Sequence, residues 1–227
     1  MAIINSLMMT STGAGSNCPA IEGKLWAWGE GNTFLGLGDT TSRSSPSQVG
    51  ALTDWTNNLS TGETTHVIKT DGTLWGWGNS DYGEMGVGNT TKYSSPVQIG
   101  SDTDWATIQG SMFCAAIKTN GTLYTWGNNF YGQLGQGDTT HRCVPTQVGS
   151  LTDWASVMIP QEDGYYMVMM KTDGTLWSMG CNDAGQLGDG TDTVRSSPVQ
   201  IGSATDWLAY IITEKTTSGR GYAISEA

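Results

Sequence analysis

The sequence has few charged residues, and those it has are mostly acidic. Asp, Glu, Lys and Arg make up only 14% of the chain, whereas soluble domains average about 25%. With 21 acidic and 10 basic residues, the formal net charge is -11. A surface of this sign repels phosphate backbones, so we expect no nucleic-acid partner.

Long apolar runs are also missing. No stretch approaches the 18 or more apolar residues of a membrane-spanning helix, so we expect no membrane insertion. The first residues, MAIINSLMMTSTGAGSNC, lack a basic region, and Asn5 and Ser6 interrupt their apolar side chains, unlike a secretory signal peptide. Solubility must come from hydroxyl and amide side chains, a composition that suits proteins outside cells or on virion surfaces. Because no signal peptide or membrane span is recognised, we expect a virion or cytoplasmic location.

Cysteine and histidine are too sparse and too scattered to suggest a site. The four cysteines, Cys18, Cys114, Cys143 and Cys181, show no C-x-x-C spacing, so we expect reduced and mostly buried thiols. Neither histidine lies near a cysteine pair, and no nucleophile motif surrounds either one. We therefore predict no metal, no other cofactor and no enzymatic activity.

The chain is instead rich in glycine, with 32 residues, and it is built from a repeat. The segment Thr119–Val148 reads TNGTLYTWGNNFYGQLGQGDTTHRCVPTQV, and its pattern recurs at Thr70–Ile99 and Thr172–Ile201. A looser copy runs from Glu22 to Val49. The turn glycines Gly23, Gly72, Gly121 and Gly174 are spaced by 49, 49 and 53 residues. A fixed period of this length indicates a repeat architecture.

Each period contains four short strand candidates. In the third repeat these are Trp105–Gln109, Cys114–Lys118, Thr122–Trp126 and Thr146–Val148, the last opened by Pro145. An Asn-Gly or Asp-Gly turn, a strong hairpin signal, joins the middle two. Four antiparallel strands per period predict an all-β, propeller-like array of four-stranded blades.

We expect one domain over residues 1–227. Its units are approximately 1–50, 51–100, 101–149 and 150–202, with a partial unit at 203–227. Ala2–Met8 and Cys18–Ile21 match the first two strands of a blade, as do Trp207–Ile212 and Gly221–Ser225. About four and a half units could form a smaller ring, an open arc with capped ends, or a ring completed by another chain.

The run Leu123–Thr140, followed by Pro145 and Gln147-Val148, resembles the repeat of the regulator of chromosome condensation family. The resemblance implies a propeller of four-stranded blades, usually seven, and this chain carries too few units for that ring. It also implies guanine-nucleotide exchange on a small GTPase, with attachment to chromatin. The net charge argues against chromatin, and no long inserted loop resembles a nucleotide-displacing wedge.

Residues that recur in every unit are interpreted as structural. The tryptophans of the Trp-Gly pairs, Trp28, Trp77 and Trp126, should pack between blades rather than form a stacking platform. The Leu-Gly-x-Gly turns lack the helix and lysine of a phosphate loop, so their glycines should serve positive φ angles. The repeated arginines should pair with local carboxylates; these arginines are Arg43, Arg142 and Arg195, with Asp39 and Asp138 as candidate partners.

Residues that break the repeat are the better candidates for function. Tyrosine is enriched where surfaces bind partners, and an acidic insertion at 161–164 lengthens one loop. The candidate partner-binding residues are Glu162, Asp163, Tyr165, Tyr166, Phe130, Tyr131, Tyr82, Tyr93 and His141. The alternative is that they reflect ordinary loop variation.

The sequence thus predicts a non-enzymatic binding or structural module that presents loops to a protein or surface partner. Its open ends suggest self-association, and its composition suggests a component of a virion surface or fibre. An enzyme inhibitor or a lectin-like glycan binder is the alternative, and guanine-nucleotide exchange ranks below both.

Overall fold

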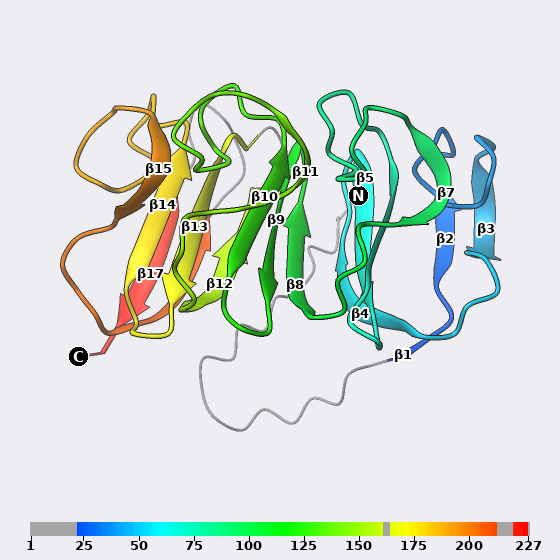
Figure 1. Ribbon diagram of the computed structural model, residues 1–227, viewed down its shortest axis with the longest axis horizontal. Helices are drawn as coiled ribbons and strands as arrows, with labels where there is room; N and C mark the ends of the chain where they lie inside the picture. Colours follow the sequence, from blue (N-terminus) through cyan, green and yellow to red (C-terminus); the bar gives the residue numbers. More distant parts are fainter. Residues whose placement is uncertain (1–21, 161–163, 213–219, 227) are drawn as a thin grey trace.

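The computed structural model describes residues 22–160, 164–212 and 220–226. This part of the chain folds into seventeen short β-strands, three complete blades and two half-blades, side by side in an open arc (Figure 1). It contains no helix long and apolar enough to cross a membrane. The predicted all-β, propeller-like arrangement of four-stranded antiparallel blades is confirmed.

The three complete blades follow one another along the chain. Blade 1 contains β4 (Trp55–Ser60), β5 (Thr64–Lys69), β6 (Leu74–Gly78) and β7 (Tyr93–Gln98), with the short β1 (Glu22–Gly23) added beside β4. Blade 2 contains β8 (Trp105–Gly110), β9 (Phe113–Lys118), β10 (Leu123–Gly127) and β11 (Arg142–Gln147). Blade 3 contains β12 (Trp154–Met158), β13 (Tyr166–Lys171), β14 (Leu176–Gly180) and β15 (Arg195–Gln200).

A two-stranded half-blade lies at each end of the arc (Figure 1). The N-terminal half-blade pairs β2 (Trp26–Gly29) with β3 (Arg43–Gln48), which correspond to the third and fourth strands of a complete blade. The C-terminal half-blade pairs β16 (Trp207–Ile212) with β17 (Gly221–Ser225), the predicted first and second strands. The strands expected at 2–8 and 18–21 lie outside the described residues.

The fourth strand of each blade differs from the prediction. In blade 2 it begins at Arg142 rather than at Thr146, so Pro145 lies within the strand instead of preceding it. Proline removes a backbone donor and is tolerated only where that donor is not needed by a neighbouring strand. β11 is the outermost strand of its sheet, so no strand lies on the side that faces away from β10. On that side, the N–H that proline lacks is not needed for a hydrogen bond between strands.

The core lies between the blades. Every residue of β5, β9 and β13 is buried, because each of these second strands packs on blades or half-blades at both of its faces. In β9, Ala115 and Ile117 contact the cluster shared with blade 3, whereas Cys114 and Ala116 contact the cluster shared with blade 1. Burial on both faces explains why β9 and β13 are continuous apolar runs up to their final lysine rather than alternating ones.

The Trp-Gly tryptophans mark the junctions between blades. Trp77 and Trp126 are 2% and 0% exposed, and each contacts the preceding unit, as predicted. Trp28 occupies the equivalent position in β2 but is 62% exposed. For Trp28 the packing prediction is wrong within the described residues, because no preceding blade lies against β2.

Candidate binding site

Three long loops form the upper rim of the arc in Figure 1; they join the third and fourth strands of each blade at 79–92, 128–141 and 181–194. In blade 2 the Asn129 side chain binds the middle and the end of its loop. It accepts a hydrogen bond from the Leu134 amide at 2.9 Å and donates one to the Thr140 carbonyl at 3.0 Å. Asn182 makes the equivalent bonds in blade 3. These buried amides hold the loops in one conformation.

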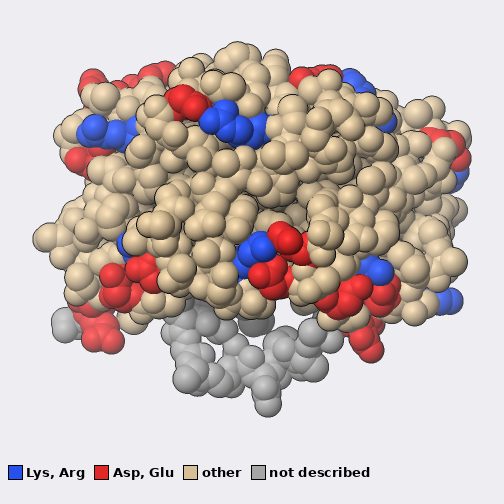
Figure 2. Space-filling view, viewed as in Figure 1, with Lys and Arg blue, Asp and Glu red and all other residues tan. Residues whose placement is uncertain are grey.

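Ion pairs flank the loops of blades 2 and 3 and the equivalent loop, 30–42, of the N-terminal half-blade. Arg142 binds Asp138 at 2.7 Å, Arg43 binds Asp39 at 2.7 Å, and Arg195 binds Asp189 at 2.7 Å. The local pairing predicted for the repeated arginines is therefore confirmed. The backbone amide of Thr140, followed by the Arg142 guanidinium, holds the pKa of Asp138 below its ordinary value. Figure 2 shows the charged residues along the upper and lower rims, with a broad uncharged band between them.

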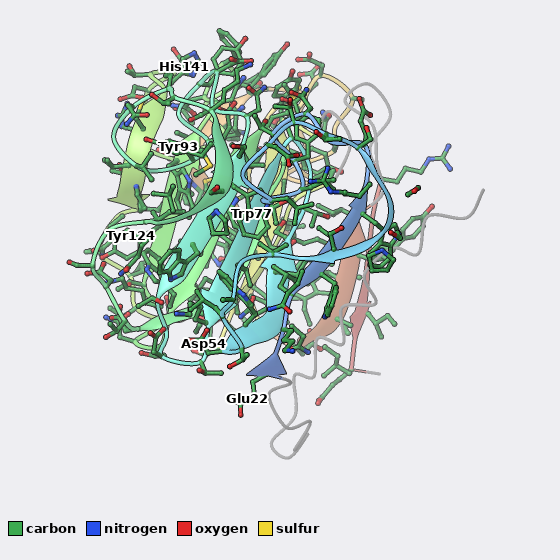
Figure 3. The ribbon with its side chains drawn as sticks, turned by 90° about the vertical axis from the view of Figure 1, so that its right-hand side faces the viewer. Glu22, Asp54, Trp77, Tyr93, Tyr124 and His141 are labelled. Atoms are coloured by element: carbon green, nitrogen blue, oxygen red, sulfur yellow. The ribbon has the colours of Figure 1, made fainter. Side chains whose placement is uncertain are left out.

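Three of the candidate residues gather where the upper-rim loops of blades 1 and 2 meet. The ring of Tyr82 lies 5.3 Å from Phe130 and 4.9 Å from His141, and Phe130 lies 4.7 Å from His141, centroid to centroid. Phe130 is 54% exposed, and the other two rings are half-buried. We call Tyr82, Phe130 and His141 the aromatic cluster; His141 lies at the top of Figure 3.

The His141 ring is fixed within this cluster. Its Nδ1 accepts a hydrogen bond of 2.9 Å from the Asn129 amide. Burial lowers the pKa of His141 from its ordinary value. The imidazole is therefore neutral at pH 7 and supplies an apolar ring face rather than a positive charge.

A second aromatic contact joins blades 2 and 3. Tyr131 follows Phe130 in its loop, and its ring lies 5.0 Å from the ring of Tyr165, which precedes β13. Both side chains are half-buried. The structure thus brings five of the nine candidate residues into two groups on neighbouring loops.

The remaining candidates do not join these groups. Tyr93 lies on β7, packs against the cluster of Trp55 and Trp77, and accepts a hydrogen bond of 3.4 Å from Asn89. Tyr166 was predicted to face a partner but is 0% exposed, because it is the first residue of β13 and packs in the core between blade 3 and the C-terminal half-blade. Glu162 and Asp163 lie outside the described residues.

Sequence analysis missed a repeated lysine on the lower rim. Lys118 Nζ lies 2.8 Å from Asp102 and 2.9 Å from Asp104, and 5.0 Å from the ring centroid of Trp105. Lys69 and Lys171 occupy the same place in their blades. The signal was a lysine three residues before the turn glycines Gly72, Gly121 and Gly174, recurring with the Asp-Trp pair. The recurrence in three blades indicates a structural role.

No arrangement for catalysis emerges among the described residues, where no three His, Cys, Asp or Glu side chains gather as metal ligands. His66 and Cys114 do meet in the core, with Sγ 3.7 Å from Nδ1, and both are fully buried. Burial lowers the pKa of His66 to about 4 and raises that of Cys114. A neutral thiol without solvent access is the opposite of an activated nucleophile.

Comparison with known proteins agrees with this architecture. The Regulator of chromosome condensation (RCC1) repeat model matches residues 71–117, 120–159 and 173–209, more than half of the chain. The chain belongs to the RCC1 repeat family. No protein with a curated description matches it significantly.

Solved structures share the RCC1 fold. Prp20p from Saccharomyces cerevisiae is 18% identical with a TM-score of 0.73, and yeast RCC1 (Prp20) in a second structure is 17% identical with 0.74. Each match covers 90% of this chain and 52% or 51% of the other. Human WBSCR16 is 22% identical with a TM-score of 0.68, covering 84% and 51%. The chain thus spans about half the length of the proteins it matches, and these identities show the fold alone.

The RCC1 repeat is offset from the blade by two strands. The match at 71–117 covers β6 and β7 of blade 1 and then β8 and β9 of blade 2. Counted in this way, β2 to β17 make four whole repeats, each divided between two blades. An array of whole repeats therefore ends in two half-blades.

Proposed function

We propose that this chain is a non-enzymatic module that binds a protein partner at the aromatic cluster of its upper rim. The observation that carries the proposal is the meeting of Tyr82, Phe130 and His141 from two loops, with Phe130 more than half exposed. Aromatic residues are enriched at interface cores and dominate their binding energy. A partner that offers an apolar side chain would pack against Phe130 at the centre.

The surroundings of the cluster suit such a contact. Buried side-chain hydrogen bonds hold the 128–141 loop before a partner arrives, which lowers the entropy lost on binding. The ion pairs Arg142–Asp138 and Lys92–Asp81 lie on the same rim and would form a polar border. Tyr131 and Tyr165 would extend the contact toward blade 3.

Relatives support a protein as the partner. The Prp20p structure was described with binding properties to Gsp1p and histones, and yeast RCC1 (Prp20) was solved bound to Kap60. This chain spans about half of those proteins, so histone binding and guanine-nucleotide exchange are not part of the proposal. The setting we favour is a virion surface or fibre, which recovery of the chain in purified particles would test.

The test compares two exposed apolar side chains at opposite ends of blade 2. Phe130→Ala removes the centre of the aromatic cluster, whereas Leu151→Ala truncates a 43%-exposed residue in the loop between β11 and β12. Partners are captured from the natural source with the wild-type chain, purified, and titrated against each variant by calorimetry. We expect Phe130→Ala to weaken binding at least about 30-fold and Leu151→Ala to change it less than about twofold.

Equal affinity of the wild type and Phe130→Ala would refute the site. A glycan array probed with the same proteins addresses the lectin alternative. Glycan binding that depends on Phe130, without a protein partner, would replace the present proposal.

A further inference from the structure

The two half-blades at the ends of the arc complement each other. The C-terminal half-blade supplies the first two strands of a blade, and the N-terminal half-blade supplies the last two. Among the described residues, β17 is hydrogen-bonded only to β16, and β2 only to β3. Within the described part of the chain, each therefore presents one strand edge without a neighbour, the kind of edge to which another chain can add a strand.

A cavity adjoins each unpaired edge. The cavity beside β17 has a volume of about 500 Å³, and its lining includes Leu187, Gly188, Trp207 and Tyr210. The cavity beside β2 has a volume of about 420 Å³, and its lining includes Trp26, Trp28, Leu59 and Val67. Both lie where the half-blade that the described residues lack would pack.

The internal junctions show what belongs in the first cavity. A third-strand side chain covers a turn glycine of the preceding unit at every junction: Trp77 at Gly36, Trp126 at Gly86 and Met179 at Gly135. Gly188 is the next glycine in this series. It keeps its contact with Ile201, which matches Ile99 at Gly86, but no described third-strand side chain lies within 4 Å of a Cβ built there. Trp28 is the third-strand tryptophan without a glycine to cover.

A second aromatic contact, between the first and third strands of a blade, has one member in each half-blade. Within each complete blade, the first-strand tryptophan packs edge-on against a third-strand ring; the pairs are Trp55–Trp75, Trp105–Tyr124 and Trp154–Trp177, with centroids 6.1, 5.3 and 6.1 Å apart. Trp207 is the first-strand member in the C-terminal half-blade and is only half-buried, unlike the other three. Trp26 is the third-strand member in the N-terminal half-blade and is exposed.

The outer face of the C-terminal half-blade matches the second cavity. Tyr222 and Ile224 occupy the positions that Ala115 and Ile117 occupy in β9, where these side chains pack on the next blade. Here they are 57% and 65% exposed. An apolar face of this kind beside Ile211, also exposed, requires a covering blade.

We propose that a second copy of this chain supplies the half-blade that the described residues lack at each end, so that two copies associate head to tail. Strand β17 of one copy pairs with β2 of the other, and the four strands form a composite blade. Trp28 then covers Gly188, and Trp26 packs against Trp207. In the same composite blade, Tyr222 and Ile224 fill the cavity beside Val67.

The curvature of the arc favours two copies over closure of one chain on itself. Three complete blades and one composite blade per copy give an eight-bladed ring from two copies, within the usual range of four to eight. Closure of one chain would need roughly 90° per blade, against about 45° in the two-copy ring. The arc superposes on chains about twice its length with a TM-score of 0.74, which fits the gentler curvature.

The pairing of β9 with β10 predicts the register of the composite blade. Thr125 lies opposite Ala115 there, and the equivalent residues are Ala27 in β2 and Tyr222 in β17. Directly opposite residues in an antiparallel pair have Cα atoms about 4.5–5.5 Å apart, within reach of a disulfide. The variant Ala27→Cys, Tyr222→Cys should therefore cross-link between copies on mild oxidation.

The cross-link is checked on a non-reducing gel with a matched control. A variant shifted by two residues, Ala27→Cys with Ile224→Cys, should cross-link at least about tenfold less, because diagonal neighbours lie about 7–8 Å apart. A covalent two-chain species from the first variant supports the composite blade. A disulfide formed within one chain would show self-closure and overturn the proposal, and equal yields from both variants would overturn the register.

Native mass spectrometry of the full chain completes the test. The wild type should have the mass of two chains at micromolar concentration, and Trp28→Ala should raise the dissociation constant at least about 30-fold. Because Trp28 is exposed in the single chain, a far-UV spectrum should stay unchanged. Phe130→Ala should leave the mass unaltered, which separates this inference from the proposed partner site. A wild-type mass other than two chains refutes the ring.

Discussion

The indole nitrogen of Trp126 in blade 2 donates a hydrogen bond of 2.7 Å to the carbonyl oxygen of Glu84 in blade 1. Trp77 repeats this bond with the Phe34 carbonyl at 2.9 Å. Met179 takes the same position in blade 3, where it has no N–H to donate. Each junction thus combines a large buried side chain with a turn glycine, and neighbouring units stabilise one another as in other repeat proteins.

Truncation of Trp126 should be strongly destabilising. Trp126→Ala opens a cavity between blades 1 and 2, and we expect a loss of about 3–5 kcal/mol in the free energy of unfolding. Phe130→Ala is the control, since it removes a similar ring from an exposed position and should cost less than about 1 kcal/mol. Urea unfolding followed by tryptophan fluorescence measures both. Similar losses would show that the junction is not where the stability lies.

Alanine variants of two turn glycines should distinguish the cost of a positive φ angle from the cost of a steric clash. Gly86 and Gly100 have φ angles of 72° and 64°, but a Cβ at Gly86 would lie 2.9 Å from Trp126 Nε1, whereas one at Gly100 meets nothing within 4 Å. Gly100→Ala should cost about 1 kcal/mol from the positive φ alone. Gly86→Ala should cost a further 1–3 kcal/mol, roughly, because Trp126 must move. Equal midpoints in thermal unfolding would contradict this account.

Acid should destabilise the fold through His66. Burial lowers its pKa in the folded chain from 6.5 to about 4, so the unfolded chain binds more protons between these values. Stability is therefore greatest above pH 6.5 and falls as the pH drops toward 4, by about 2 kcal/mol between pH 7 and pH 5. His66→Gln should flatten this dependence in urea titrations at several pH values. An unchanged slope would show that another group titrates.

We expect Lys118 on the lower rim to contribute more to stability than Lys92 on the upper rim. Burial lowers the pKa of Lys118, but Asp102 and Asp104 outweigh it and hold the ammonium charged. Lys118→Met loses both ion pairs and the contact with Trp105, and we expect a cost of about 1–2 kcal/mol. Lys92→Met removes only an exposed pair with Asp81 and should cost less than about 1 kcal/mol. Thermal unfolding of both variants at one salt concentration would reveal the difference, and equal shifts would contradict it.

Much of the fold could be predicted from local signals. The Asn-Gly and Asp-Gly turns determine hairpins over a few residues, and their recurrence predicts blades without knowledge of distant contacts. The predicted strands Trp207–Ile212 and Gly221–Ser225 agree with the structure residue for residue. The fourth strand was misplaced around Pro145, because the sequence does not show that this strand has no neighbour on its outer side.

The candidate site was predicted only as a set of residues. Tyr82 and Phe130 lie in different repeats, and their contact depends on how one blade is turned against the next. Tyr165 and Tyr166 are adjacent in sequence, yet one is half-buried and the other lies in the core. Position in the repeat does not decide which face a side chain occupies at the start of a strand.

By itself, the sequence determined the repeat, the hairpins and the type of side chain at each junction, since these follow from local turn chemistry and periodicity. Only the tertiary structure decided which junctions are filled. Trp28, Trp77 and Trp126 have the same local motif, but burial depends on a neighbouring unit that supplies the facing turn. Two of these tryptophans have that neighbour in the described chain, and Trp28 does not.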